Sequence, residues 1–153
     1  MPVGLYNMEK EQFIIYTDGG ARGNPGPAAI GVVLKDASGH ILKEYGEAIG
    51  EATNNEAEYR AVIFALEKAK SVFGKKKAKE ATVIVRMDSE LVSRQLNGEY
   101  KIEEERLAAH FLKIWNLKID FGEVIFHHVP REENKQADRM VNKALDLQAR
   151  TLF

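Results

Sequence analysis

The pattern of apolar residues changes near residue 53, and this change restricts the folds that the chain can adopt. Before it, residues 12–17, 29–36 and 40–49 are rich in β-branched and apolar residues and are joined by short connections, which predicts three antiparallel strands. After it, helical and strand patterns alternate, which is typical of parallel pairing through right-handed crossovers. We therefore expect an α/β fold with a mixed five-stranded sheet, three antiparallel strands then two parallel, flanked by helices.

The part of the chain after residue 53 contains six expected elements. They are helices over residues 55–73, 89–96, 102–117 and 133–149, and strands over residues 81–87 and 123–129. The basic run at residues 74–80 is expected to close the first helix. Trp115 lies on the apolar side of its helix with Phe111, so we expect its indole in the core.

Length and composition suit one ordinary globular domain. The chain has 153 residues, and we expect a flexible segment over residues 1–11, a domain over residues 12–149 and a tail over residues 150–153. Lys plus Arg is 22 and Asp plus Glu is 23, so bulk charge does not attract nucleic acid. The absence of cysteine excludes disulfides and thiolate metal sites. With neither a signal-peptide core nor a bilayer-spanning run, we expect a cytoplasmic monomer without membrane contact.

Two carboxylates follow strands whose ends should meet. Asp18 follows the first predicted strand, and Asp88 follows the fourth. In open α/β sheets the chemistry gathers at the carboxyl ends of the strands, so these two acids would lie side by side if their strands are parallel neighbours. Such a pair repels and would hold a proton unless a divalent cation is present, and Mg²⁺ prefers oxygen ligands.

Two more acids come from helices. Glu58 lies three residues before Ala61, on the helix edge that faces the sheet, whereas Glu56 stands three residues after Thr53, the spacing of a capping box. We therefore assign Glu58 to the site and Glu56 to the cap. Asp138 borders the apolar stripe of the last helix. Each acid alone is typical of a turn or a cap, but four acids that converge from separate elements indicate a metal site.

Four segments resemble a known family. TDGGARGNPGPAAIG, TNNEAEYRAVIFAL, MDSELV and ENKQAD occur in this order. They resemble the type 1 ribonuclease H family over residues 12–148. The resemblance implies a ribonuclease H-like fold and an endonuclease that cuts the RNA strand of RNA–DNA hybrids, leaving 5′-phosphate and 3′-hydroxyl ends. It also implies two Mg²⁺ ions, with Mn²⁺ as a substitute, held by a catalytic set on Asp18, Glu58, Asp88 and Asp138.

The resemblance further implies which residues contact the substrate. The glycine-rich segment and the TNN segment would lie along the minor groove of the hybrid, where 2′-hydroxyls distinguish RNA. A pocket for a DNA phosphate carries over onto Thr53 and Asn134. The predicted substrate-binding residues are Gly19, Arg22, Gly23, Asn24, Thr53, Asn54, Asn55 and Asn134. The RNA–DNA hybrid is the expected partner, and double-stranded RNA remains open as a second substrate.

The sequence departs from the family pattern in two places. Many members carry a histidine on the loop before the last acid; His128 stands ten residues before Asp138, but at the end of a predicted strand. Arg131 in VPRE matches a mainly archaeal-like subgroup, and we favour it over His128. An arginine cannot act as a general base near neutral pH, but it can neutralise phosphate charge.

Residues 91–121 also lack the basic, tryptophan-bearing protrusion of the well-known bacterial form.

Two other functions remain as alternatives. A metal nuclease of the same fold could act on DNA, but the NPGP and TNN segments serve hybrid recognition in the family. A catalytically inactive nucleic-acid-binding module would be expected to have lost at least one carboxylate, and all four are present.

Overall fold

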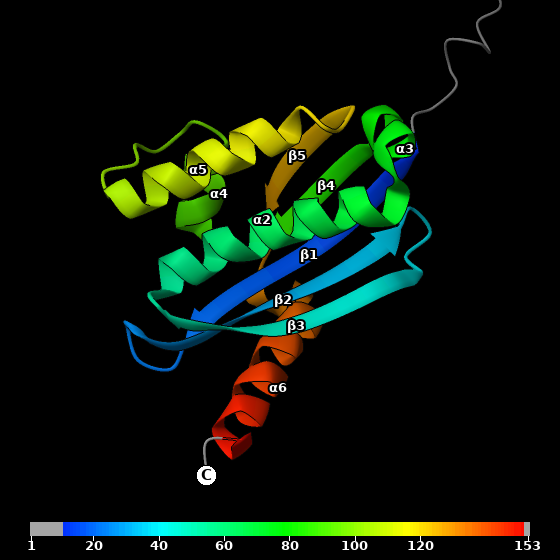
Figure 1. The fold of residues 1–153 in the computed structure, drawn as a ribbon. Coiled ribbons are helices and arrows are strands. Elements are labelled where there is room, and N and C mark those ends of the chain that lie inside the picture. The colour runs from blue at the N-terminus through cyan, green and yellow to red at the C-terminus, as the bar shows by residue number, and fades with distance from the viewer. Residues whose placement is uncertain (1–10, 152–153) are drawn as a thin grey trace, which may run out of the picture.

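A five-stranded mixed sheet lies at the centre of the computed structural model, which describes residues 11–151 (Figure 1). The strand order is β3-β2-β1-β4-β5. β1 is antiparallel to β2 and parallel to β4, β2 is antiparallel to β3, and β4 is parallel to β5. The predicted fold class is thus confirmed. Of the predicted flexible segment over residues 1–11, all but Glu11 lies outside the described residues, as do the last two residues of the predicted tail.

The predicted elements follow one another in the predicted order, and the structure adds the short helix α3 and the turn η1. The full set is β1 (Gln12–Ala21), β2 (Gly26–Asp36), β3 (Ile41–Ala52), α2 (Asn54–Phe73), α3 (Lys75–Glu80), β4 (Thr82–Met87), α4 (Glu90–Leu96), α5 (Glu105–Lys118), β5 (Glu123–His128), the 3-10 turn η1 (Arg131–Glu133) and α6 (Lys135–Thr151). α2 and α5 lie on one face of the sheet, and α6 lies against the other (Figure 1).

Most elements have at least one predicted boundary that was wrong by a few residues; for example, β2 begins at Gly26 rather than at residue 29, and β3 ends at Ala52 rather than at residue 49. β1 continues through Asp18 to Ala21, because β2 is long enough to pair with it there and Asp18 stands opposite Gly31. Residues 75–80 form the separate helix α3, because Gly74 has a φ of 85° and interrupts the helical backbone. α5 begins at Glu105 rather than at residue 102.

The core lies between the sheet and α2. Strand residues such as Phe13 and Ile15 alternate toward this face, as expected for a pleated strand. α2 presents small residues to them, and its buried side chains include Ala61, Ala65 and Ala69. Small side chains let the helix lie close to the sheet, so its polar first turn also comes near the end of β1.

Two glycines permit close contact between the sheet and the helices on both faces. A Cβ atom at Gly19 would overlap the backbone carbonyl of Ala57 in α2. A Cβ atom at Gly31 would overlap the carbonyl oxygen of Ala137 in α6. α2 and α6 therefore both reach the part of the sheet where Asp18 lies.

The prediction for Trp115 was wrong. Leu107 and Ile114 are the buried residues of α5, whereas Trp115 is 47% exposed. Trp115 is the residue after Ile114 and is therefore turned by about 100° around the helix, past the contact with α2. Its ring stacks on Phe111 with 5.4 Å between centroids.

The connection between α4 and α5 is short. It comprises residues 97–104 and contains no further helix, so this part of the described chain forms no protrusion. Across residues 11–151, every helix is too short or too polar to cross a membrane.

Candidate active site

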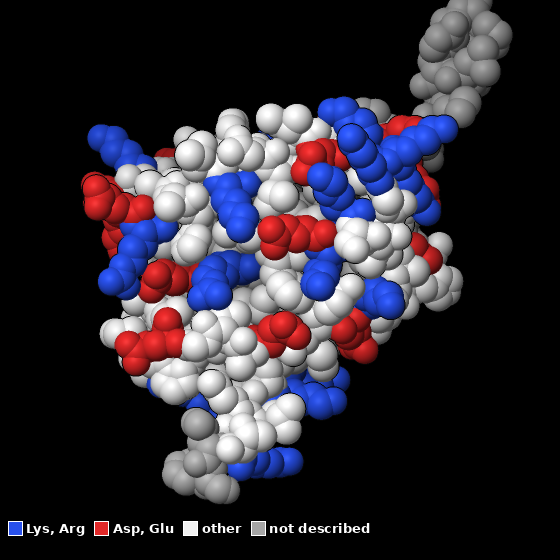
Figure 2. All heavy atoms as spheres, viewed as in Figure 1, with Lys and Arg blue, Asp and Glu red and all other residues white. Residues whose placement is uncertain are grey.

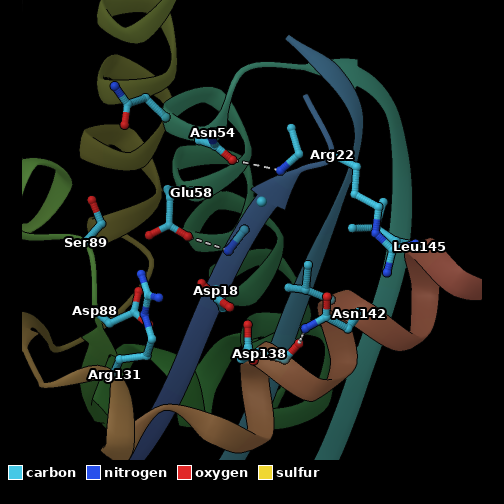
Figure 3. A pocket seen from close by; sticks show the side chains of 15 residues that line it. Asp18, Arg22, Asn54, Glu58, Asp88, Ser89, Arg131, Asp138, Asn142 and Leu145 are labelled. Atoms are coloured by element: carbon cyan, nitrogen blue, oxygen red, sulfur yellow. Dashed lines mark hydrogen bonds between the residues drawn. The ribbon is translucent and has the colours of Figure 1, made fainter. Parts of the chain in front are cut away.

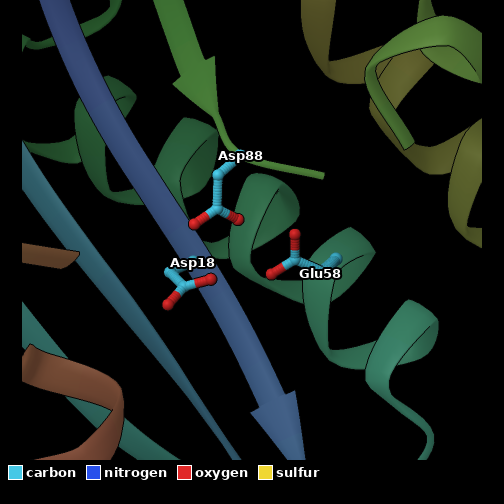
Figure 4. A group of neighbouring side chains, drawn as sticks. All are labelled: Asp18, Glu58 and Asp88. Atoms are coloured by element: carbon cyan, nitrogen blue, oxygen red, sulfur yellow. The ribbon is translucent and has the colours of Figure 1, made fainter. Parts of the chain in front are cut away.

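Three carboxylates meet at one end of the sheet. Asp18, Glu58 and Asp88 each offer one oxygen, and these oxygens all lie within 4.8 Å of one another (Figure 4). Asp18 and Glu58 are each 9% exposed, and Asp88 is half-buried. A buried group of acids with this spacing can hold a divalent cation by oxygen ligands alone.

The parallel pairing of β1 and β4 brings the two aspartates together. Thr17 stands opposite Met87 in this pair, so the next residue on each chain, Asp18 and Asp88, lies at the same level. The predicted neighbourhood of the two strands is thereby confirmed.

The second turn of α2 supplies the third acid, Glu58. The backbone N–H of Gly19 donates a hydrogen bond to Glu58, which fixes this carboxylate against β1. Glu56 instead accepts a hydrogen bond from the backbone N–H of Thr53, and the Thr53 hydroxyl accepts one from the backbone N–H of Glu56. Glu56 thus forms the predicted capping box, and Glu58 faces the cluster.

Asp138 approaches from the opposite face of the sheet. It lies in the first turn of α6, is exposed, and faces the pocket that the other three acids line (Figure 3). It is not part of the group whose oxygens lie within 4.8 Å of one another. Its charge nevertheless reaches Asp18, whose pKa it helps to raise.

Burial and mutual repulsion disfavour the charged form of the cluster. Burial raises the pKa of Asp18 from 3.8 to about 7, opposed by a hydrogen bond with Glu58 and reinforced by the charges of Asp88 and Asp138. Burial, followed by the charge of Asp18, raises the pKa of Glu58 well above 4.5. A bound cation would balance these charges, so the cluster takes up either protons or metal.

An open pocket of about 440 Å³ surrounds the cluster. Of the predicted substrate-binding residues, Gly19, Arg22, Asn54 and Asn55 line it. The side chain of Asn54 accepts a hydrogen bond from the backbone N–H of Ala21 at 2.9 Å. The side chain of Asn24 accepts one from the backbone N–H of Asn54 at 3.0 Å. These bonds join the β1–β2 loop to the start of α2, next to the acids.

The other predicted substrate-binding residues do not line the pocket. Gly23 turns the β1–β2 loop with a φ of 99°, and Thr53 caps α2. Asn134 is 1% exposed, and its side-chain amide donates to the backbone carbonyl of Thr17 at 2.8 Å. Asn134 therefore lies beneath the surface, and its contact with a phosphate stays a prediction.

Arg131 and His128, the two candidates for a catalytic role on the loop before Asp138, differ in position. Arg131 begins η1 and points into the pocket (Figure 3). His128 is exposed at the end of β5, where it stands opposite Met87, and it is not among the residues that line the pocket. The arrangement favours Arg131 on position alone.

Sequence reasoning missed several pocket residues. They are Gly20, Ala21, Ser89, Val141, Asn142 and Leu145. Helical spacing could have found three of them, since Val141, Asn142 and Leu145 stand three, four and seven residues after Asp138. Ser89 accepts a hydrogen bond from the backbone N–H of Val92 and caps α4.

Comparison with known proteins gives consistent matches. Residues 16–144 match the family model described as "Reverse transcriptase-like". Ribonuclease HI of Halobacterium salinarum is 44% identical over 131 residues, which is 86% of this chain and 63% of the relative. A bifunctional protein of Mycobacterium tuberculosis is 41% identical over 139 residues, 90% of this chain and 36% of the relative. The chain thus spans less than two thirds of the length of these curated relatives.

Two solved structures are similar to this chain over nearly their whole length. The crystal structure of LC11-RNase H1 in complex with an RNA/DNA hybrid has a TM-score of 0.85 at 51% identity, covering 90% of this chain and 99% of that chain. RNase H1 from the halophilic archaeon Halobacterium salinarum has a TM-score of 0.81 at 42% identity, covering 88% of this chain and 98% of that chain.

Proposed function

The chain belongs to the type 1 ribonuclease H family, and from this premise we propose that it hydrolyses the RNA strand of RNA–DNA hybrids, leaving 5′-phosphate and 3′-hydroxyl ends. The observation that carries the proposal is the buried group of Asp18, Glu58 and Asp88, with Asp138 facing it across the pocket. The similarity to LC11-RNase H1, which was crystallised with an RNA/DNA hybrid, supports the choice of substrate.

We propose that the site holds two Mg²⁺ ions, for which Mn²⁺ can substitute. The donor set supports this, because every candidate ligand is a carboxylate oxygen and hard divalent cations prefer oxygen. The raised pKa values of Asp18 and Glu58 also indicate negative charge that a cation would balance. When bound, the two ions would supply activation of the attacking water and stabilisation of the leaving 3′ oxygen.

The residues of the chain hold this site in shape. The Gly19 N–H fixes Glu58, and the β1–β4 pairing fixes Asp18 beside Asp88. Asp138 is exposed at the pocket and would complete the ligand set from the α6 side. Arg131 would neutralise the charge of the phosphate that enters.

The β1–β2 loop and the start of α2 would recognise the hybrid. Asn24, Asn54 and Asn55 stand together beside the acids, and amide side chains can both donate to and accept from a 2′-hydroxyl. We extend the proposal to Gly19 near the end of β1 and to Arg22 and Gly23 on the loop. We also propose that the protein is a cytoplasmic monomer. Double-stranded RNA is a second candidate substrate, because its minor groove displays the same hydroxyls.

Cleavage of strand-labelled duplexes tests the function. RNA–DNA hybrid, double-stranded RNA and double-stranded DNA are incubated with Mg²⁺, Mn²⁺ or EDTA, and the products are resolved by strand. We expect metal-dependent cutting of the RNA strand in the hybrid. Binding without cutting under every metal would contradict the proposal and favour an inactive binding module, and cutting of DNA would favour another metal nuclease.

A further inference from the structure

The outer face of α6 carries a row of cations beside the pocket. Lys135, Arg139 and Lys143 recur every four residues, and Arg150 follows seven residues later, so all four lie on one side of the helix. The buried residues Ala137, Val141 and Leu145 are on the opposite side, against the sheet. All four cations are exposed.

This cationic row has little carboxylate to balance it. Among the ion pairs formed within residues 11–151, none includes one of the four cations. Asp146 lies on the same face, but it is paired with Arg22 of the β1–β2 loop at 2.6 Å. The face that carries α2 and α5 differs, because basic and acidic side chains are interspersed over it (Figure 2).

The cationic row is continuous with the pocket. A second hollow, of about 380 Å³, is lined by Arg139, Lys143 and Arg150, and Asn142 lines both this hollow and the pocket of the acids. Arg22 lines the pocket and reaches Asp146, which lines the second hollow. A strand that lies over Asp138 can therefore continue along α6 without leaving the protein surface.

We propose that the outer face of α6 binds the phosphate backbone of the hybrid beyond the cleavage site. This inference rests on the proposed function and names a surface through which a chain without a basic protrusion could hold its substrate. The row spans 15 residue steps, or about 22 Å of helix at 1.5 Å per residue. A strand carries one phosphate per about 3.4 Å of duplex axis, so this length corresponds to about six base pairs.

Salt-dependent binding tests the proposal. We compare the triple variant Arg139→Ala/Lys143→Ala/Arg150→Ala with its parent, and both proteins carry Asp18→Asn to prevent cleavage. Fluorescence anisotropy measures their affinities for a hybrid of about 20 base pairs from about 50 to 200 mM KCl. Each lost phosphate contact should lower the slope of log affinity against log salt by about 0.9. We expect a loss of two to three contacts and about a tenfold or greater loss of affinity at low salt.

Two controls distinguish phosphate binding by α6 from a general effect of lost positive charge. Cleavage by the unmutated chain tests the proposed function separately. Lys43→Ala/Lys75→Ala/Lys76→Ala removes the same charge from exposed positions in β3 and α3 and should leave the slope close to that of the parent. A hybrid of about 6 base pairs, which cannot cover both the acids and the whole of α6, should show a smaller difference between parent and α6 variant. An unchanged slope in the α6 variant, or an equal fall in the control, would overturn the proposal. If the unmutated chain cleaves no hybrid, the proposed function fails whatever the slopes are.

Discussion

The side-chain amide of Asn134 donates a hydrogen bond to the backbone carbonyl of Thr17, 2.8 Å away, and so joins the chain just before α6 to the residue before Asp18. Asn134 is 1% exposed, and its Oδ1 is buried without a hydrogen-bond partner among the described residues. This contact links the two segments that carry Asp18 and Asp138.

Asn134→Ala removes this buried donor, and we expect it to lower the free energy of unfolding by about 1–3 kcal/mol. Activity should fall as well, because the α6 segment with Asp138 loses its attachment to β1. Urea denaturation and initial cleavage rates measure the two effects. Glu132→Ala, an exposed change in η1, is the control and should cost less than about 0.5 kcal/mol. Equal stability of the two variants would show that the hydrogen bond contributes nothing.

Gly19→Ala should be far more harmful than Gly20→Ala. A Cβ atom at Gly19 meets backbone atoms of α2, which cannot move without separating the helix from the sheet. At Gly20 the nearest atoms are 3.8 Å and 4.0 Å away, an ordinary contact. We expect Gly19→Ala to cost about 3 kcal/mol, the upper end of the usual range for overpacking, and to displace Glu58. Thermal unfolding of both variants compares them, and similar melting temperatures would contradict the close approach of α2.

The element order and the choice of acids could be predicted from sequence, because both rest on local periodicity. Asp18 and Asp88 follow apolar strands, and the helical spacing from Glu58 to Ala61 separates it from Glu56. Positions that depend on long-range packing could not be predicted. Trp115 has the right periodicity for a core residue, but α5 packs through a narrower stripe that ends at Ile114.

Burial of polar residues was equally hidden from sequence. Asn134 stands in a polar stretch that is typical of an exposed cap, and only the η1 turn before it directs its amide toward Thr17. The extension of β1 past Asp18 likewise depends on its pairing with β2, which no local pattern specifies.

Glu58→Gln and Glu56→Gln distinguish the site from the cap. Glu58→Gln retains an oxygen that can accept from the Gly19 N–H but loses the charge, so we expect nearly all activity to be lost while the fold remains. Glu56→Gln keeps a capping-box residue type and should cost less than about 1 kcal/mol of stability and little activity. Initial cleavage rates beside far-UV circular dichroism measure both effects. The reverse ranking of activities would show that the roles of Glu56 and Glu58 are assigned wrongly.

Asp18→Asn should stabilise the metal-free protein above pH 7. Burial raises the pKa of Asp18 to about 7 in the folded state against 3.8 as its usual value, so the folded protein binds the extra proton. Ionisation of Asp18 therefore lowers the free energy of unfolding by its full amount above about pH 7. The loss becomes smaller as the pH falls and is absent below about pH 3.8. Because Asp18 and Glu58 interact, the effect of one substitution is smaller than the full shift of the Asp18 pKa would give. We expect Asp18→Asn to raise the free energy of unfolding by on the order of 2 kcal/mol at pH 8 and to leave it unchanged at pH 3.5.

Urea unfolding in EDTA across this pH range measures the effect. Mg²⁺ should then stabilise the parent more than Asp18→Asn, because the variant lacks one anionic ligand. Equal stabilisation of the two proteins by Mg²⁺ would contradict the assignment of Asp18 as a ligand.

Arg131→Ala should lower cleavage about tenfold or more, the effect of one lost hydrogen bond to a charged group, whereas His128→Ala should leave the rate close to that of the parent. Arg131 points into the pocket, and His128 lies outside it at the end of β5. Arg131→Lys should recover part of the rate, because it restores the charge without the planar guanidinium. Rates are compared from pH 5.5 to 8.5, since a histidine that transfers a proton would impose a limb on the pH–rate profile. If His128→Ala removes such a limb and Arg131→Ala does not affect the rate, His128 fills the loop role instead.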